Sequence, residues 1–289
     1  LAGLVRHDVE SATRAELVAK TRADNARRRE RHAGKSRRAP QLSIAEARER
    51  RHACDWDNYT PPAPSFTGAR VIDDLRLDVL RNYIDWMPFF NAWEFHGKFP
   101  GILSDPVVGA AASILFADAT RLLDRIIDEN WLQAKAVFGF FPAHSEDDDL
   151  LVYADDARAT QLARLCHLRQ QRAKPEGQPQ QCLADFVAPA DSGLADYIGA
   201  FAVTAGIGID EHVARFEAEH DDYNAIILKA LADRLAEAAA EYLHERVRRE
   251  HWGYAADEQL SNDELIEEKY TGIRPAPGYP ACPDHTEKD

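Results

Sequence analysis

The sequence predicts an α+β domain built on a mainly antiparallel sheet. Three observations support this class: helical periodicity comes first along the chain, short runs rich in Val, Ile, Phe and Tyr lie between residues 136 and 205, and a long helical pattern follows. Strands that are grouped apart from helices are typical of α+β domains. With 289 residues, 45% of them hydrophobic, the chain is long enough to bury a substantial core.

The first 56 residues have the character of a basic linker. Residues 1–52 hold 14 Lys and Arg against 7 Asp and Glu, a net charge of +7, so with −14 overall the rest of the chain carries −21. A helical pattern over 9–32 has few large apolar side chains to bury. The basic residues could contact an anionic partner, although a solvated charged segment is the more common case. We therefore expect a helical linker over 1–56 and the domain over 57–289.

Capping signals and prolines mark the end of this linker. Ser43 and Glu46 form an S-x-x-E capping box, which predicts a short helix to about His52. The sequence YTPPAP at residues 59–64 cannot be helical, because proline lacks the amide hydrogen and restricts its predecessor. The domain is expected to begin just before this segment.

Helical and strand patterns alternate in blocks through the domain. A helix should start at Asp105, whose carboxylate can accept amide hydrogens while Pro106 occupies the first turn. Four short apolar runs then predict strands, with the first two forming a hairpin. These runs are residues 136–142, 150–154, 182–187 and 197–204. Residues 162–169 fit either a helix or a strand.

A long helix is predicted after the strands, from about Asp210 to Arg249. Its apolar residues recur at threes and fours, and its acidic start and basic end suit the helix dipole. Ser261 and Glu264 form a second capping box before a short acidic helix. From Gly272 onward, four prolines predict a rigid extended loop.

Composition and motifs exclude several function classes. The acidic domain argues against nucleic acid as a partner, because binding phosphates needs clustered Lys and Arg. No apolar run approaches the ~20 residues of a membrane span. Motifs for dinucleotide binding, phosphate binding and nucleophilic catalysis are missing, so no catalytic residue is expected. The four cysteines are scattered without zinc spacing, which predicts no metal site and a cytoplasmic protein with reduced thiols.

One segment is a candidate binding loop, the sequence RPAPGYPACPDH at residues 274–285. Its prolines reduce the entropy lost on folding, and Gly278 permits close approach of the main chain to a ligand. Tyr279 can stack or hydrogen-bond, and Arg274 can hold a carboxylate through two parallel hydrogen bonds. The alternative is a rigid surface loop whose arginine makes a structural ion pair.

Carboxylates supply the second candidate feature. Asp85 lies among aromatic and apolar residues in YIDWMPFF, and a carboxylate buried there needs a partner. That partner is either a neighbouring amide or helix end, or a cationic ligand. Asp233, Glu237 and Glu241 fall at i, i+4 and i+8 of the long helix, a spacing that favours a solvated acidic stripe.

Seven segments together resemble the activation domain of cobalamin-dependent methionine synthase. They are VLRNYIDW (79–86), LADFVAP (183–189), ADYIGAFAV (195–203), HDDYN (220–224), KALADRLAE (229–237), EYLHER (241–246) and RPAPGYPACPDHTEK (274–288). The resemblance spans residues 57–289. Residues 1–56 resemble the tether that joins this domain to the preceding cobalamin-binding domain.

The resemblance implies a C-shaped α+β domain that binds S-adenosylmethionine and docks over the cobalamin domain to reactivate oxidised cob(II)alamin. Flavodoxin or a flavoprotein reductase would supply the electron, and S-adenosylmethionine the methyl group. The implied ligand contacts are Asp85, Arg274, Ala276, Gly278, Tyr279 and, on the long helix, Glu237. Cobalamin would be held by the neighbouring domain, and zinc would lie only in other domains of the parent enzyme.

The chemistry of S-adenosylmethionine suits the candidate loop and the candidate carboxylates. Its carboxylate suits Arg274, while its ammonium and sulfonium groups suit Asp85, Glu237 and the acidic domain. No side chain need act as a general acid or base, because methyl transfer from a sulfonium to reduced cobalt depends on proximity and orientation.

The family pattern continues beyond Asp289 with a segment whose tyrosines complete the ligand site. Because the chain also starts at Leu1, we expect a fragment of a longer protein. The alternative function is a non-catalytic docking module for the cobalamin domain and flavodoxin that does not hold S-adenosylmethionine. A methyltransferase of the Rossmann type is disfavoured, because the glycine-rich turn between strand and helix is missing.

Overall fold

The structure, a computed structural model, describes residues 18–23, 25–27, 29, 40–279 and 281–283. The chain divides into two compact units. The smaller unit comprises residues 1–50 and 171–180, and the larger comprises residues 51–170 and 181–289. The linker boundary expected after residue 56 stays a prediction.

The smaller unit contains the first capped helix, α3 (Ile44–Glu49). The Glu46 amide donates to the Ser43 hydroxyl at 3.3 Å, and the Ser43 amide donates to the Glu46 carboxylate at 2.8 Å. This reciprocal pair confirms the predicted capping box. Just before it, the Leu42 amide donates to the Gln171 carbonyl at 2.8 Å and so joins the two segments of this unit.

The helix predicted over residues 9–32 lies partly outside the described residues. Residues 18–23, 25–27 and 29 are helical, and nearly all of them are exposed. A helix with few large apolar side chains is expected to be solvated in this way.

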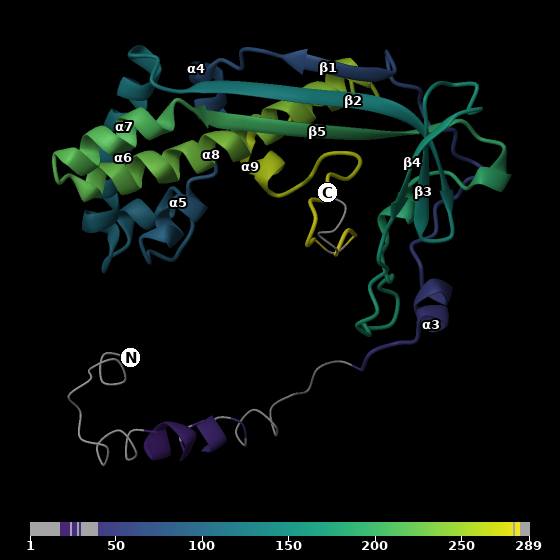
Figure 1. The fold of residues 1–289 in the computed structure, drawn as a ribbon, viewed down its shortest axis with the longest axis horizontal. Helices are drawn as coiled ribbons and strands as arrows, with labels where there is room; N and C mark the ends of the chain where they lie inside the picture. Colours follow the sequence, from purple (N-terminus) through teal and green to yellow (C-terminus); the bar gives the residue numbers. More distant parts are fainter. Residues whose placement is uncertain (1–17, 24, 28, 30–39, 280, 284–289) are drawn as a thin grey trace. The chain divides into compact units, whose positions relative to one another are not determined.

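The larger unit is built on a five-stranded antiparallel sheet (Figure 1). Its strands are β1 (Gly68–Ile72), β2 (Gln133–Glu146), β3 (Asp149–Tyr153), β4 (Gln161–Cys166) and β5 (Asp196–Ile207). The long strand β2 is central, because β1 and β5 pair with it on either side and β3 pairs with its last residues. The remaining strand, β4, pairs with β3. This arrangement confirms the predicted α+β class and the predicted hairpin.

Strand β1 was not anticipated from the sequence. It has only five residues, and Arg70 at its centre interrupts the apolar run. The residues of β1 pair in register with Ala136 to Phe140 of β2. Residues 162–169, which fitted either class, begin as a strand because β4 pairs with β3.

The strand predicted over residues 182–187 is wrong. This segment forms a 3₁₀ helix, Leu183–Phe186, which begins with a capping interaction. The Asp185 carboxylate accepts from the Cys182 amide at 3.0 Å. A side chain that satisfies a backbone amide favours a tight turn over an extended strand, and this signal was hidden by the apolar residues around it.

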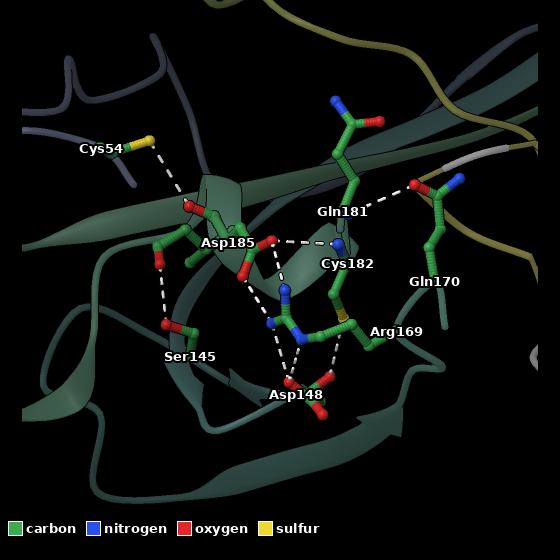
Figure 2. Close-up of polar contacts among 9 residues, drawn as sticks. Cys54, Ser145, Asp148, Arg169, Gln170, Gln181, Cys182 and Asp185 are labelled. Carbon is green, nitrogen blue, oxygen red and sulfur yellow. Dashed lines mark hydrogen bonds and ion pairs between the residues drawn. The ribbon is translucent and has the colours of Figure 1, made fainter. Parts of the chain in front are cut away.

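A buried arginine fixes this turn to the end of the sheet (Figure 2). The Arg169 guanidinium donates to both carboxylate oxygens of Asp185, at 2.8 and 2.6 Å. Its Nε donates to Asp148, in the turn between β2 and β3, at 2.9 Å. The side chains of Arg169 and Asp185 are almost fully buried, so this ion pair is shielded from water and salt.

Six α-helices lie in the described part of the larger unit. They are α4 (Leu77–Leu80), α5 (Met87–Ala92), α6 (Gly109–Asp128), α7 (Ile209–Ala218), α8 (Asp222–Arg246) and α9 (Asn262–Ile266). The longest, α8, packs against β5, α6 and α7. The core lies between its buried face, which includes Leu228, Leu231 and Leu235, and the side chains of Phe138 and Phe140 on β2.

The single helix predicted from Asp210 to Arg249 is wrong. The structure has two helices, α7 and α8, separated at His220, whose φ of 57° is in the left-handed region. The Asp221 side chain accepts from the Asn224 amide at 3.0 Å and starts α8. Helix α8 ends at Arg246 and continues as a π-helical turn through His251.

Two other helix starts test the capping signals. The second capping box is confirmed, because the Glu264 amide donates to the Ser261 hydroxyl at 3.3 Å at the start of α9. The Asp105 carboxylate accepts from the Val107 and Val108 amides at 2.8 and 3.0 Å. It therefore caps a turn, and α6 begins only at Gly109.

Candidate functional site

The proline-rich segment after α9 forms a compact loop held by its own backbone. The Tyr279 amide donates to the Ala276 carbonyl at 3.1 Å, and the Gly278 amide donates to the Cys282 carbonyl at 2.7 Å. Gly278 has φ of 99°, a conformation that favours glycine. Ala276, Gly278 and Tyr279 are exposed, and the Tyr279 side chain has no stacking partner among the described aromatic rings. These three residues are therefore accessible to a ligand.

The arginine at the start of this loop pairs with a glutamate of α8. The Arg274 Nη2 donates to the Glu241 Oε2 at 2.8 Å, and both side chains are largely buried. Burial raises the pKa of Glu241, while Arg274 and Arg248 act in the opposite direction. The ion pair considered as the alternative for Arg274 therefore exists, and it joins the loop to the helix.

A stripe of polar residues on α8 and the π-helical turn after it faces the chain that leads into this loop. Glu241, His244 and Arg248 are all buried on one side of the helix. The Arg248 guanidinium donates to Glu258 through Nε at 2.8 Å, and its Nη1 lies 2.7 Å from the His244 Nδ1. Its guanidinium also lies 4.4 Å from the ring centre of Tyr270. Together these contacts fix the segment after α8 against the helix.

Burial and charge keep His244 neutral. Desolvation lowers its pKa to about 3, with the nearby cations Arg248 and Arg274 acting in the same direction. Because Arg248 can only donate, the His244 Nδ1 is the acceptor and the ring proton lies on Nε2. The edge of the His244 ring meets the Tyr270 ring, with centres 4.7 Å apart.

Asp85 lies between a 3₁₀ turn (Arg81–Tyr83) and α5. Its Oδ1 accepts from the Met87 amide at 2.9 Å, at the start of that helix. A neighbouring amide is therefore its observed partner, one of the two alternatives given by the sequence. Within the described part of the chain, no donor reaches its second oxygen, which leaves this oxygen for another partner.

The segment that carries Asp85 packs against α8 and the start of α9. The Tyr83 hydroxyl donates to the Glu245 carboxylate at 2.6 Å, and burial together with this bond raises the pKa of Tyr83. The Asn262 side chain donates to the Ile84 carbonyl at 3.4 Å. Asp85 and the Arg274 loop are thus both attached to the C-terminal part of α8, through different residues.

Glu237 lies one helical turn before Glu241 on α8 and is exposed. Among the described residues it has no hydrogen bond or ion pair. No hydrogen bond or ion pair joins Asp85, Glu237 and Arg274 to one another within that part of the chain. The structure thus places these candidates on elements that pack against α8 or belong to it. Among the described residues, one carboxylate oxygen of Asp85 and both of Glu237 accept no hydrogen bond.

Glu241 is the site residue that sequence reasoning did not select. It was grouped with Glu237 in a solvated stripe, but it is buried and holds Arg274. A signal was present, since Glu241 precedes His244 by three residues and Arg248 by seven, which places all three on one face of a helix. Such a polar stripe beside the apolar face predicts that a second side of the helix is covered by another part of the chain.

Two cavities lie away from the six candidate residues. One of about 80 Å³ is lined by His52, Cys54 and the 3₁₀ turn that contains Asp185. The other, of about 160 Å³, lies between α4 and the end of α8. In the described part of the chain, no cluster of three or more His, Cys, Asp or Glu could hold a metal ion, and no helix is long and apolar enough to cross a membrane.

Comparisons with known proteins identify relatives of this chain. A family model described as vitamin B12 dependent methionine synthase, activation domain, matches residues 76–289. The chain is also similar to a crystal structure of the MetH reactivation domain bound to AdoHcy, with 55% sequence identity and a TM-score of 0.81. That alignment covers 86% of this chain and 76% of the other.

Proposed function

The chain belongs to the activation-domain family of vitamin B12-dependent methionine synthase, and from this premise we propose that it binds S-adenosylmethionine to support the reductive methylation of inactive cob(II)alamin. The product of this step is methylcobalamin, the form that takes part in methionine biosynthesis. The observation that carries the proposal is the loop of Arg274, which is held against α8 by a buried glutamate. The relative that is 55% identical is described as bound to AdoHcy, the compound left when S-adenosylmethionine loses its methyl group.

The chemistry of the residues present fits this ligand. Arg274 uses one of its five N–H donors on Glu241, and the others can hold the carboxylate of the ligand. Asp85 and Glu237 have uncommitted carboxylate oxygens that suit the ammonium and sulfonium groups. The exposed backbone of Ala276 and Gly278 and the ring of Tyr279 can contact the rest of the ligand.

The ligand would supply a methyl group on a positively charged sulfur, ready for transfer to reduced cobalt. This chain's residues would bind and orient it, because such a displacement needs alignment of the reacting atoms rather than a proton carrier. The chain is thus the methyl-donor module of a methyltransferase. Cobalamin and the catalytic zinc would belong to other domains of the parent enzyme.

We expect two protein partners and a cytoplasmic setting. The cobalamin-binding domain of the same enzyme must present its cobalt to the bound ligand, and flavodoxin or a flavoprotein reductase would supply the electron. Cys54 and Cys182 are thiols in the structure, as is usual in a reducing compartment. The docking module without ligand binding is not favoured, given the AdoHcy-bound relative.

A methyl-transfer assay tests the proposal. The chain is mixed with the separately produced cobalamin-binding domain carrying cob(II)alamin, a flavodoxin reducing system and methyl-labelled S-adenosylmethionine. We expect label in methylcobalamin only when the chain is present, because the chain alone positions the donor. Formation of a complex without label transfer, together with undetectable binding of the ligand, would instead support the docking module.

A further inference from the structure

The glutamate that holds Arg274 is placed to determine the direction of its guanidinium. Glu241 is 9% exposed and lies within α8, near the C-terminal end of that helix. A helix packed into the core gives its side chains few alternative positions. The loop of Arg274, in contrast, is held mainly by short-range bonds within residues 276–282. Glu241 is therefore the rigid member of the pair.

The geometry of the pair leaves most of the guanidinium available. Only Nη2 of Arg274 contacts Glu241, at 2.8 Å, so four of the five N–H donors are not used by it. The second oxygen of Glu241, Oε1, is buried and has no partner among the described residues. A single bond from a fixed acceptor restricts the positions that the planar group can take and leaves its other N–H donors available.

Burial raises the pKa of Glu241, and nearby cations oppose this effect by favouring its ionised form. The facing groups are Arg274 and Arg248, with Glu268 acting in the opposite direction. Arg248 is already committed to Glu258 and His244, and His244 is neutral. Arg274 is therefore the cation that most directly compensates the buried carboxylate, and removing it would leave a charge without compensation.

We propose that Glu241 is the positioning residue for Arg274, orienting its guanidinium toward the carboxylate of the S-adenosyl ligand. Glu241 acts through Arg274 and need not touch the ligand. A pre-oriented donor loses less entropy when the ligand binds, so the gain in affinity should be specific to ligands that carry the carboxylate. This inference rests on the proposed function, and it assigns a specificity role to a residue outside the predicted set.

The test compares two ligands on three proteins. Binding of S-adenosylmethionine and of decarboxylated S-adenosylmethionine is measured by calorimetry on the wild type, Glu241→Gln and Glu241→Ala. The wild type should prefer the carboxylated ligand, and Glu241→Ala should lose about tenfold of that preference. Glu241→Gln retains an acceptor for Arg274 and should restore most of it. A purely structural role would weaken both ligands equally.

The binding data distinguish a failure of the proposed function from a failure of the positioning role. If the wild type binds neither ligand, the proposed function fails and this inference fails with it. If the wild type prefers the carboxylated ligand and Glu241→Ala keeps the full preference, only the positioning role is overturned. If Glu241→Ala does not fold, Glu241→Asp replaces it, because the shorter side chain retracts the acceptor. An unchanged preference in that variant would equally overturn the role.

Discussion

Burial shifts the pKa values of several polar side chains in this protein. For His244, the shift should be measurable as a pH dependence of the unfolding free energy. Its pKa in the folded protein is about 3, against 6.5 as the ordinary value. Below about pH 6.5 the unfolded chain takes up a proton that the folded chain does not. The free energy of unfolding should therefore fall as pH decreases from about 6.5 toward 3, by at most about 1.4 kcal/mol per pH unit.

Chemical unfolding of the wild type and of His244→Gln between about pH 5 and pH 6.5 isolates this contribution. Glutamine can still accept from Arg248 but cannot be protonated, so the variant should lose less stability on acidification than the wild type does. The exposed His96→Gln is the matched control and should behave like the wild type. Equal pH dependence in the wild type and His244→Gln would show that His244 is not held neutral.

Among single residues, the sequence indicated candidate ligand-binding side chains but not the side chains that they contact in the folded protein. Asp85 and Arg274 were singled out by their surroundings and by the loop around them, and both lie on elements that meet α8. Glu241 was missed because its spacing from Glu237 indicated an exposed stripe. Only the packing of the later chain against α8 makes the next turn of that stripe buried.

Among the elements, the 3₁₀ turn at Leu183–Phe186 depends on the buried Arg169 (Figure 2). Arg169→Met should leave the carboxylates of Asp148 and Asp185 without compensation and cost about 3–5 kcal/mol of unfolding free energy. Urea unfolding measures this change. The matched control is Arg164→Met on β4, whose carboxylate partners are more exposed. That variant should unfold at nearly the wild-type urea concentration, and similar losses in both variants would contradict the account.

Elements with strong local signals were predicted, and those that depend on distant partners were not. Both capping boxes and the hairpin between β2 and β3 were correct, because the residues that define them are close in sequence. The turn at 183–186 has a local cap from Asp185 that its apolar neighbours hid, and it is also held by Arg169 from a separate segment. Strand β1 needs β2 as its partner. The break at His220 had a local signal in Asp221, which the surrounding helical periodicity outweighed.

For the whole molecule, fold class and family were available from the sequence, whereas the assembly of the site was not. Blocks of helix and strand predicted the α+β class, and ordered matches along the chain indicated the family that residues 76–289 match. The placement of the Asp85 segment and the Arg274 loop against α8 and α9 depends on the packing of segments up to 178 residues apart. Such long-range packing leaves no periodic trace in the chain.

The central claim is that this chain binds S-adenosylmethionine through the Arg274 loop, and a calorimetric titration tests it most directly. S-adenosylmethionine is titrated into the wild type and into Arg274→Ala. The matched control is Arg121→Ala, on the exposed surface of α6. We predict saturable binding by the wild type and the control, and a loss of about 1.5–3 kcal/mol in Arg274→Ala, as expected for a charge-assisted pair. Absence of binding by the wild type, or equal affinity in Arg274→Ala, would contradict the account.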